Sequence, residues 1–369
     1  MRILLLSDIN SVHTQKWAIG LSSAGLKIGL FSMNRSNSDW YSSIPNITIL
    51  SQANQQLKGV SFIEKAGYFS YLKSIKRSVS DFKPDIVHAH YASSYGMLGA
   101  LSGFHPFIIS VWGADVYDFP AKSFLNKALL KFNLRKADRI LSTSEVMKIE
   151  TMKYTSSDVG VTPFGVDTEV FYPRVRDELV FSKSDIVIGQ VKSLEQKYGT
   201  SVLIEAFKLV TDRFPNLSLK LLLVGGGSLY NDLIEKTKQL GISDNVIFTG
   251  SVFHSEIAKY HNMIDIFVSA SIDDSESFGV SAVEACACAK AVVVARTGGL
   301  KEVVLENETG LIAERGDANS TADAISKFIS SPELRKLYGE RARQHVLKRY
   351  DWKKNLSLMI EIYKDLIRR

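Results

Sequence analysis

The chain has 369 residues, of which 45% are hydrophobic and 23% charged, and this composition excludes a disordered, collagenous or coiled-coil protein and suits two or three globular domains. Its net charge of +6 is uneven, because residues 1–165 carry 18 basic and 11 acidic residues while the remainder carries 27 and 28. The basic surplus of the first half predicts an anionic partner there.

Short apolar runs typical of buried strands alternate with helical stretches along the first half of the chain. The run 2–7 meets Asp8, so it is too short for a signal peptide and indicates a strand. The expected strands are 2–7, 28–32, 85–89, 106–111 and 139–143, and the longer helices are 14–25, 62–81 and 122–136.

The same alternation returns after a break at 162–167, where Pro163 and Gly165 interrupt regular structure. Further strands are expected at 186–191, 218–224, 246–249, 266–270 and 291–295, with helices near 200–214, 228–240, 254–262 and 279–289. So many strands predict an α/β protein with two doubly wound, Rossmann-like domains, 1–167 and 168–350, whose parallel sheets face a cleft. The helix 351–369 is expected to return to the first domain.

Two cysteines and the absence of long apolar runs limit the compartment. Cys286 and Cys288 are one residue apart on an expected helix and point to different faces, which excludes a disulfide scaffold and a cysteine-rich zinc site. No run of 18 apolar residues exists to span a bilayer. We expect a cytoplasmic protein that is able to bind peripherally at the inner face of the cell membrane.

The loop after the strand 266–270 carries the strongest chemical pattern. It places Glu276 just before a helix that begins near Gly279, and Glu284 inside that helix. The amides of Phe278, Gly279 and Val280 would then be free to bind a phosphate. At about 12 Å the two carboxylates are too far apart for a glycosidase pair. They suit hydroxyls at opposite ends of a phosphorylated ligand, although isolated glutamates are more often solvated surface charges.

With four other elements, this Glu-Ser-Phe-Gly-x4-Glu pattern resembles the family 4 retaining glycosyltransferases, which have the GT-B fold. The resemblance covers nearly the whole chain. The other elements are Thr-Pro-Phe-Gly-Val-Asp at 162–167, Val-Gly-Gly-Gly at 224–227, Phe-Thr-Gly-Ser-Val at 248–252 and Gly-Gly with a following Glu at 298–302. Each is weak alone, but their joint order and spacing are specific.

The resemblance implies that the second domain binds a nucleotide-diphosphate sugar. Glu276 would orient the sugar, and Glu284 would bond the ribose hydroxyls. Lys192, which replaces the family arginine, and Lys197 would grip the diphosphate, where cations stabilise the leaving charge. By the same resemblance, Ser277 would lie with the loop amides at the donor phosphates, and Val252 would lie near the base.

The implied reaction retains the anomeric configuration and takes place on one face of the sugar, with a phosphate oxygen receiving the acceptor proton. It needs no metal and no cofactor beyond the donor substrate. Asp273 and Asp274 are adjacent rather than spaced as a metal-binding pair, so we interpret them as loop charges.

Acceptor residues are expected in the first domain, at His13, His90, Trp112 and Asp115. Most relatives carry histidine at the Trp112 position. An indole N–H donates a hydrogen bond but accepts no proton, so Trp112 is excluded as a base. For His13, a structural role at the start of a helix is an equal alternative.

The basic helix 122–136 carries five cations and no acid, and it could lie on anionic lipid. An ordinary surface helix that packs its apolar face on the sheet is the alternative.

The sequence thus favours an enzyme that moves a sugar to a lipid-linked or saccharide acceptor, in bacterial cell-surface polysaccharide biosynthesis. A nucleotide-sugar epimerase and a non-catalytic subunit of a transferase complex remain alternatives. A dehydrogenase is disfavoured because residues 225–227 form no Gly-x-Gly-x-x-Gly run, and no nucleic-acid-binding motif accompanies the basic charge.

Overall fold

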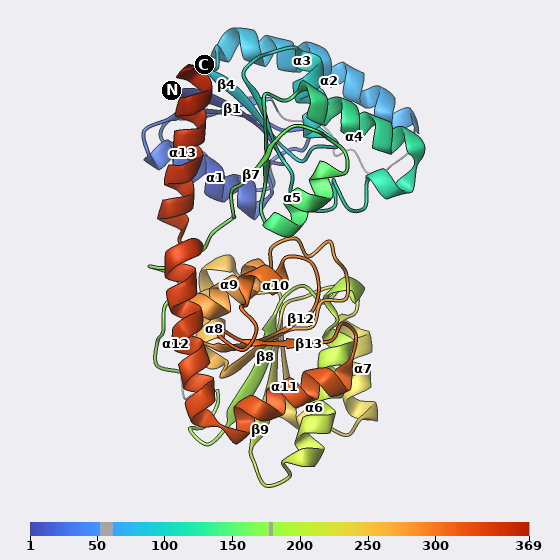
Figure 1. Cartoon of the computed structure of the whole chain (residues 1–369), viewed down its shortest axis with the longest axis vertical. Helices are drawn as coiled ribbons and strands as arrows, with labels where there is room; N and C mark the ends of the chain where they lie inside the picture. The colour runs from blue at the N-terminus through green and yellow to red at the C-terminus, as the bar shows by residue number, and fades with distance from the viewer. Residues whose placement is uncertain (52–61, 177–179, 369) are drawn as a thin grey trace. The chain divides into compact units, whose positions relative to one another are not determined.

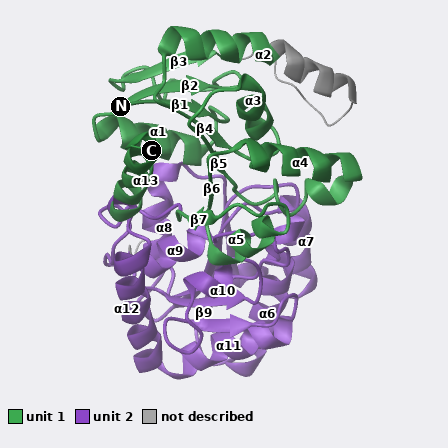
Figure 2. Ribbon diagram, turned by 45° about the horizontal axis from the view of Figure 1, so that its top comes forward, with its two compact units in different colours: residues 1–163, 354–369 green, residues 164–353 purple. Residues whose placement is uncertain are grey.

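The computed structural model describes residues 1–51, 62–176 and 180–368. They form two compact units, which are coloured separately in Figure 2. Unit 1 comprises Met1–Pro163 with Lys354–Arg369, and unit 2 comprises Phe164–Lys353. Each unit is a parallel sheet with helices, which confirms the predicted fold class.

Unit 1 contains a seven-stranded parallel sheet in the order β3-β2-β1-β4-β5-β6-β7. Its strands are β1 (Arg2–Leu6), β2 (Lys27–Phe31), β3 (Ile47–Ser51), β4 (Ile86–His90), β5 (Phe107–Ser110), β6 (Arg139–Ser142) and β7 (Val159–Val161). Its helices are α1 (Val12–Ser23), α2 (Phe62–Phe82), α3 (Tyr95–Ser102), α4 (Phe124–Lys136), α5 (Glu145–Met152) and α13 (Trp352–Arg368) (Figure 1). The five expected strands are present, and the sheet gains β3 and β7 at its edges.

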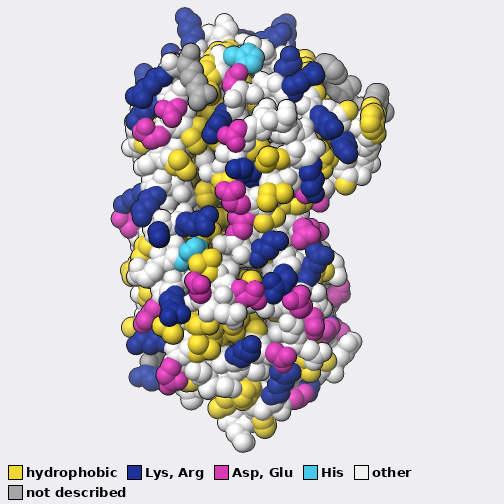
Figure 3. All heavy atoms as spheres, viewed as in Figure 1, with side chains coloured by type: hydrophobic (Ala, Val, Ile, Leu, Met, Phe, Trp, Pro, Cys, Tyr) yellow, Lys and Arg dark blue, Asp and Glu magenta, His cyan; other side chains and the backbone are white. Residues whose placement is uncertain are grey.

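Unit 2 contains a six-stranded parallel sheet in the order β10-β9-β8-β11-β12-β13. Its strands are β8 (Ile186–Val191), β9 (Leu219–Val224), β10 (Val246–Gly250), β11 (Ile266–Ser269), β12 (Ala291–Ala295) and β13 (Leu311–Ala313). Its helices are α6 (Thr200–Arg213), α7 (Tyr230–Gln239), α8 (Ile257–Met263), α9 (Val280–Ala287), α10 (Leu300–Val303), α11 (Ala318–Ser330) and α12 (Pro332–Arg349). On the face shown in Figure 3, its basic and acidic side chains are interspersed.

The last helix, α13, belongs mostly to unit 1 although the chain reaches it from unit 2. Its Met359 and Tyr363 are buried, and the Tyr363 hydroxyl lies 2.7 Å from Nδ1 of His88 on β4. Among the described residues, no helix combines the length and apolar character needed to cross a bilayer.

The carboxyl ends of the central strands locate the places where ligands are expected. In both sheets the strand order reverses beside the first strand, at β1/β4 in unit 1 and at β8/β11 in unit 2. Open α/β sheets bind ligands outside the carboxyl ends of the strands at such switch points.

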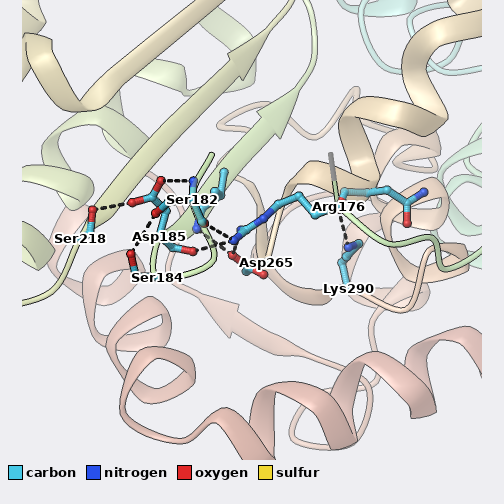
Figure 4. Close-up of polar contacts among 9 residues, drawn as sticks. Arg176, Ser182, Ser184, Asp185, Ser218, Asp265 and Lys290 are labelled. Atoms are coloured by element: carbon cyan, nitrogen blue, oxygen red, sulfur yellow. Dashed lines mark hydrogen bonds and ion pairs between the residues drawn. The ribbon is translucent and has the colours of Figure 1, made fainter. Parts of the chain in front are cut away.

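A cluster of polar side chains around Arg176 lies at the other end of the unit 2 sheet, at the amino ends of its strands (Figure 4). The Arg176 guanidinium lies 2.8 Å from the Asp265 carboxylate and donates to the carbonyls of Ser182 and Asp185. Asp265 also accepts the backbone N–H of Val187 at 2.9 Å. This cluster anchors the segment before β8 to the sheet, away from the carboxyl ends of the strands.

Candidate functional site

A partly buried ion pair joins the carboxyl ends of the two central strands of unit 2. Lys192 follows β8, Glu276 lies in the loop after β11, and Nζ of Lys192 is 2.8 Å from Oε2 of Glu276. Burial opposes the positive charge of Lys192, but the Glu276 carboxylate, with Tyr198 and Glu284, outweighs it and raises the pKa of Lys192. The lysine is therefore a fixed positive charge at neutral pH.

A second cation, that of Lys197, lies near the same aromatic ring as Lys192. Nζ of Lys192 lies 4.5 Å from the centre of the Tyr198 ring, and Nζ of Lys197 lies 5.0 Å from it. Lys197 sits on the short turn Gln196–Tyr198, and its carbonyl accepts the N–H of Ile272 at 2.9 Å. The turn that carries Lys197 is thus tied to the segment that follows β11.

Close backbone contacts at a glycine hold the Glu276 loop in place. The Gly299 N–H donates to the Glu276 carbonyl at 2.9 Å. A Cβ at Gly299 would lie 2.1 Å from the Ser277 carbonyl oxygen, closer than atoms can pack. The Gly-Gly element at 298–299 therefore braces the loop, which explains why the sequence needs small residues there.

The helix expected near Gly279 begins within one residue of its predicted start. Helix α9 starts at Val280, directly after Gly279, which has a left-handed φ of 77° that favours glycine. Ser277 and Phe278 are buried before it, and Val280 is half-buried. The Val252 side chain is half-buried just beyond β10.

Glu284 has a partner that the sequence did not reveal. Its Oε2 lies 3.2 Å from Nε2 of His261, a fully buried residue on α8. The imidazole packs against the rings of Phe171 and Phe267, with centroids 6.0 and 5.6 Å away. His261 therefore positions the Glu284 carboxylate, and only the packing of α8 against α9 brings the two together.

The carboxylates of the adjacent Asp273 and Asp274 have hydrogen-bond and ion-pair partners within the protein. Asp273 accepts the Ser275 N–H, and this bond lowers the pKa of Asp273 despite the opposing effect of burial. Asp274 accepts from the Gly298 N–H at 3.2 Å and lies 3.0 Å from the Arg315 guanidinium. Within 1–51, 62–176 and 180–368, no group of three or more His, Cys, Asp or Glu residues could hold a metal ion.

Unit 1 has a pocket of about 400 Å³ at the carboxyl ends of β1, β4 and β5. Two expected residues meet there, because the His90 ring stacks on Trp112 with centroids 4.4 Å apart. The ring of His13 meets the Trp112 indole edge-on at 5.8 Å. The lining residues are Ser7, Asp8, Ser11, Met33, Asn34, His90, Tyr91, Ser94, Tyr95 and Trp112.

The two histidines at the end of β4 are buried and neutral. Burial lowers the pKa of His88 to about 3, and His88 bonds the hydroxyls of Ser110 and Tyr363. Burial also takes the pKa of His90 well below its usual value, with help from His88 and His13. Nδ1 of His90 lies 3.0 Å from the Ser7 hydroxyl, so the ring is held in place without charge.

Asp115 is not among the residues that line the pocket. It has no exposed surface, and its carboxylate accepts the N–H groups of Ala92, Trp112 and Gly113 at 2.7, 3.1 and 2.9 Å. Burial raises the pKa of Asp115 although these bonds oppose the shift. The structure therefore gives Asp115 the task of holding the Trp112 loop, whereas the sequence suggested a cleft residue.

Comparison with known proteins covers both units. The family model "Glycosyl transferase 4-like" matches residues 2–144, and "Glycosyl transferases group 1" matches residues 172–345. The chain is 27% identical over 296 residues to N-acetyl-alpha-D-glucosaminyl L-malate synthase of Bacillus anthracis, which covers 77% of this chain and 75% of the relative. It is 33% identical over 218 residues to D-inositol 3-phosphate glycosyltransferase of Corynebacterium urealyticum, covering 56% and 50%.

A solved structure matches over almost the entire length. Anabaena HepE in complex with UDP is 18% identical, with a TM-score of 0.83 over 99% of this chain and all of that one. This likeness supports the two-sheet GT-B fold. Because the two family models together match most of both units, the chain belongs to the family 4, group 1 glycosyltransferases and is a glycosyltransferase of the GT-B fold.

Proposed function

We propose that the enzyme transfers a sugar from a nucleotide-diphosphate sugar to a saccharide or lipid-linked acceptor, with retention of configuration, in bacterial cell-surface polysaccharide biosynthesis. The observation that carries the proposal is the half-buried ion pair of Lys192 and Glu276, with Lys197 near the same Tyr198 ring. A departing diphosphate gains negative charge, and cations already fixed at that position lower the barrier.

The remaining donor contacts follow from the positions of the side chains around this pair. Glu276 would take the sugar hydroxyls, and Glu284, held by His261, would take the ribose hydroxyls. The amides at the start of α9 are suited to a phosphate, since they lie at a helix N-terminus beside the Glu276 loop. Val252 would contact the base.

The proton of the acceptor is best received by the leaving phosphate itself. Trp112 accepts no proton, and His90 is a weak base because its pKa lies well below the usual value. The acceptor hydroxyl would then attack the same face from which the diphosphate departs. In this mechanism the two lysines supply the positive charge, and we propose no metal or cofactor.

The names of the relatives guide the choice of donors. HepE binds UDP in its solved complex, so uridine donors come first in a panel with GDP- and ADP-sugars. A donor that binds the folded state should raise the melting temperature in proportion to its concentration over Kd. The donor that does so is then supplied with saccharide acceptors, and the product's anomeric configuration is read by NMR. Inversion, or loss of turnover only when a chelator is present, would contradict the proposed mechanism.

We further propose that α4 brings unit 1 to an anionic lipid surface. Its Leu130 and Leu134 are buried in the core of unit 1, so most of the apolar face packs as in an ordinary surface helix. Phe124 and Leu125 at its first turn are nevertheless 82% and 70% exposed. The exposed cations of this segment are Lys122, Lys127, Lys131, Arg135 and Lys136.

This contact is tested by sedimentation with vesicles of neutral or anionic lipid. Binding should require anionic lipid and low salt, since each cation near such a surface contributes about 1 kcal/mol. Replacing Lys127 and Lys131 by Glu should abolish sedimentation, whereas the same change at Lys327 and Lys336, exposed in unit 2, should leave it intact. Equal binding to neutral vesicles would exclude the contact.

A further inference from the structure

The pocket of unit 1 is lined by polar and aromatic groups but almost no charge. Small hydrogen-bonding side chains come from Ser11, Asn34 and Ser94, and ring faces or edges come from Tyr91 and Trp112. Among the residues that the structure describes, no Lys or Arg lines this pocket. An anionic ligand would therefore find no side-chain cation there.

The one formal charge in the lining is negative. His90 is neutral because burial depresses its pKa, which leaves the Asp8 carboxylate alone. Asp8 is held by the N–H of Asn10, at 3.0 Å from Oδ1. Its field also reaches Tyr41, whose pKa is raised first by burial and then by the charge of Asp8. The electrostatic environment near Asp8 is therefore unfavourable for a second negative charge.

Two helix starts can at most offset this field. Ser11 and Ser94, the residues that precede α1 and α3, both line the pocket. A helix N-terminus carries about half a positive charge, and its effect fades within the first turn. Two such half charges match the single negative charge of Asp8, which lies in the same loop as the start of α1, so no net positive charge remains to hold a carboxylate or phosphate.

We infer that this pocket binds an uncharged, hydroxyl-rich acceptor group, such as one pyranose unit, and discriminates against anionic acceptors. Asp8 accepts hydrogen bonds from hydroxyls of that group, Asn34 donates and accepts, and the aromatic side chains contact the apolar face of the ring. This inference rests on the proposed function. A neutral acceptor would distinguish this chain from the two relatives whose names specify malate and inositol phosphate, both of which are anions.

The test compares probes that match in shape and differ in charge. Saturation-transfer NMR on the full chain with UDP present would measure binding of methyl α-D-glucopyranoside, the galactoside and the mannoside, each against its uronate. We expect at least one neutral glycoside to bind and its uronate to bind weaker by on the order of tenfold or more, because a like charge nearby is repelled at low effective dielectric.

Two variants test whether Asp8 causes the difference in binding between a neutral glycoside and its uronate. Asp8→Asn should tighten binding of the uronate and narrow the difference within each pair. The matched change Asp81→Asn, at an exposed carboxylate paired with Arg77, should leave the difference as it is. L-malate and D-inositol 3-phosphate serve as further anionic probes.

Tighter binding of a uronate, of malate or of inositol phosphate than of every neutral probe would overturn the inference, as would no binding of any neutral glycoside. An unchanged difference in Asp8→Asn would overturn the role of that carboxylate. These failures remain distinguishable from failure of the proposed function, since donor binding is read separately from the melting temperature with UDP-sugars. If no nucleotide sugar raises the melting temperature, the proposed function itself fails.

Discussion

The two units use the same sheet topology to build sites of opposite character. At the switch point of unit 2, Lys192 and Glu276 form a partly buried ion pair, and the buried carboxylate of Glu284 lies within hydrogen-bond distance of His261. At the corresponding point of unit 1, His90 is neutral and stacks on Trp112. The difference follows from the proposed tasks, because a leaving diphosphate needs fixed cations whereas a neutral acceptor needs shape and hydrogen bonds.

Removing charge from the unit 2 site should have the largest effect. We expect Glu276→Gln and Lys197→Ala each to lower kcat about 10²–10³-fold, the loss typical for one preorganised electrostatic contact to the transition state. The measurement is steady-state transfer with the donor identified by melting temperature, and circular dichroism checks that the fold persists.

The exposed Lys327 on α11 provides the control for this experiment. Lys327→Ala should retain activity, because its side chain lies on the surface of the same unit away from the central strands. Near-wild-type turnover in both Glu276→Gln and Lys197→Ala would remove the site that we assign to unit 2.

The uncharged site of unit 1 should make that unit sensitive to acid. Below pH 6.5 the unfolded chain binds a proton at His88, but the folded chain does not until about pH 3. The free energy of unfolding therefore falls as the pH drops through this window, by about 2 kcal/mol at pH 5 for His88 alone. His90 acts in the same direction.

Hydrogen exchange of the full chain at pH 7.5 and pH 5 would show which unit loses protection. We expect the loss in β4 and its neighbours in unit 1, and a weaker pH dependence in His88→Gln. Changing the exposed His254 of unit 2 to Gln should have no such effect. Equal loss of protection in both units would show that these buried histidines do not set the acid response.

The sequence predicted the central strands of both sheets, but only β10, expected at 246–249, among the four edge strands. The run 186–191 coincides with β8, because a fully buried parallel strand reads as a continuous apolar stretch. The edge strands β3, β7 and β13 were missed, since β7 and β13 have only three residues and β3 is partly exposed. Local pattern is weak in such short or half-buried segments.

In the candidate site, too, features set by neighbouring residues were predictable, whereas contacts between residues far apart in the sequence were not. The start of α9 and the place of Glu276 were predictable, because a loop and a helix N-terminus are local features. The contact of His261 with Glu284 joins residues 23 positions apart on different helices, and the burial of Asp115 depends on backbone N–H groups from two loops. Such contacts arise only once the strands are ordered in the sheet.

His261 should affect donor binding more than the chemical step. In His261→Phe, the ring packing against Phe171 and Phe267 is retained but the hydrogen bond to Glu284 is lost. We expect the KM of the donor to rise about tenfold with kcat nearly unchanged, since Glu284 would hold ribose hydroxyls that do not react. An equal fall in kcat, or a melting temperature too low for assay at 25 °C in both His261→Phe and His261→Gln, would assign His261 to the fold or the chemistry instead.

The smallest expected effect is that of salt on KM, and it compares the two sites directly. Salt screens exposed charges strongly and buried ones weakly, so the KM of the donor should rise only a few-fold between about 50 and 500 mM NaCl. The KM of a neutral acceptor should stay constant over the same range, because its pocket holds no cation among the described residues and therefore gains nothing from long-range attraction. Replacing NaCl by a neutral osmolyte controls for solvent effects. If acceptor KM rises with salt as steeply as donor KM, then both sites recognise charge, and the electrostatic contrast between the units does not extend to their ligands.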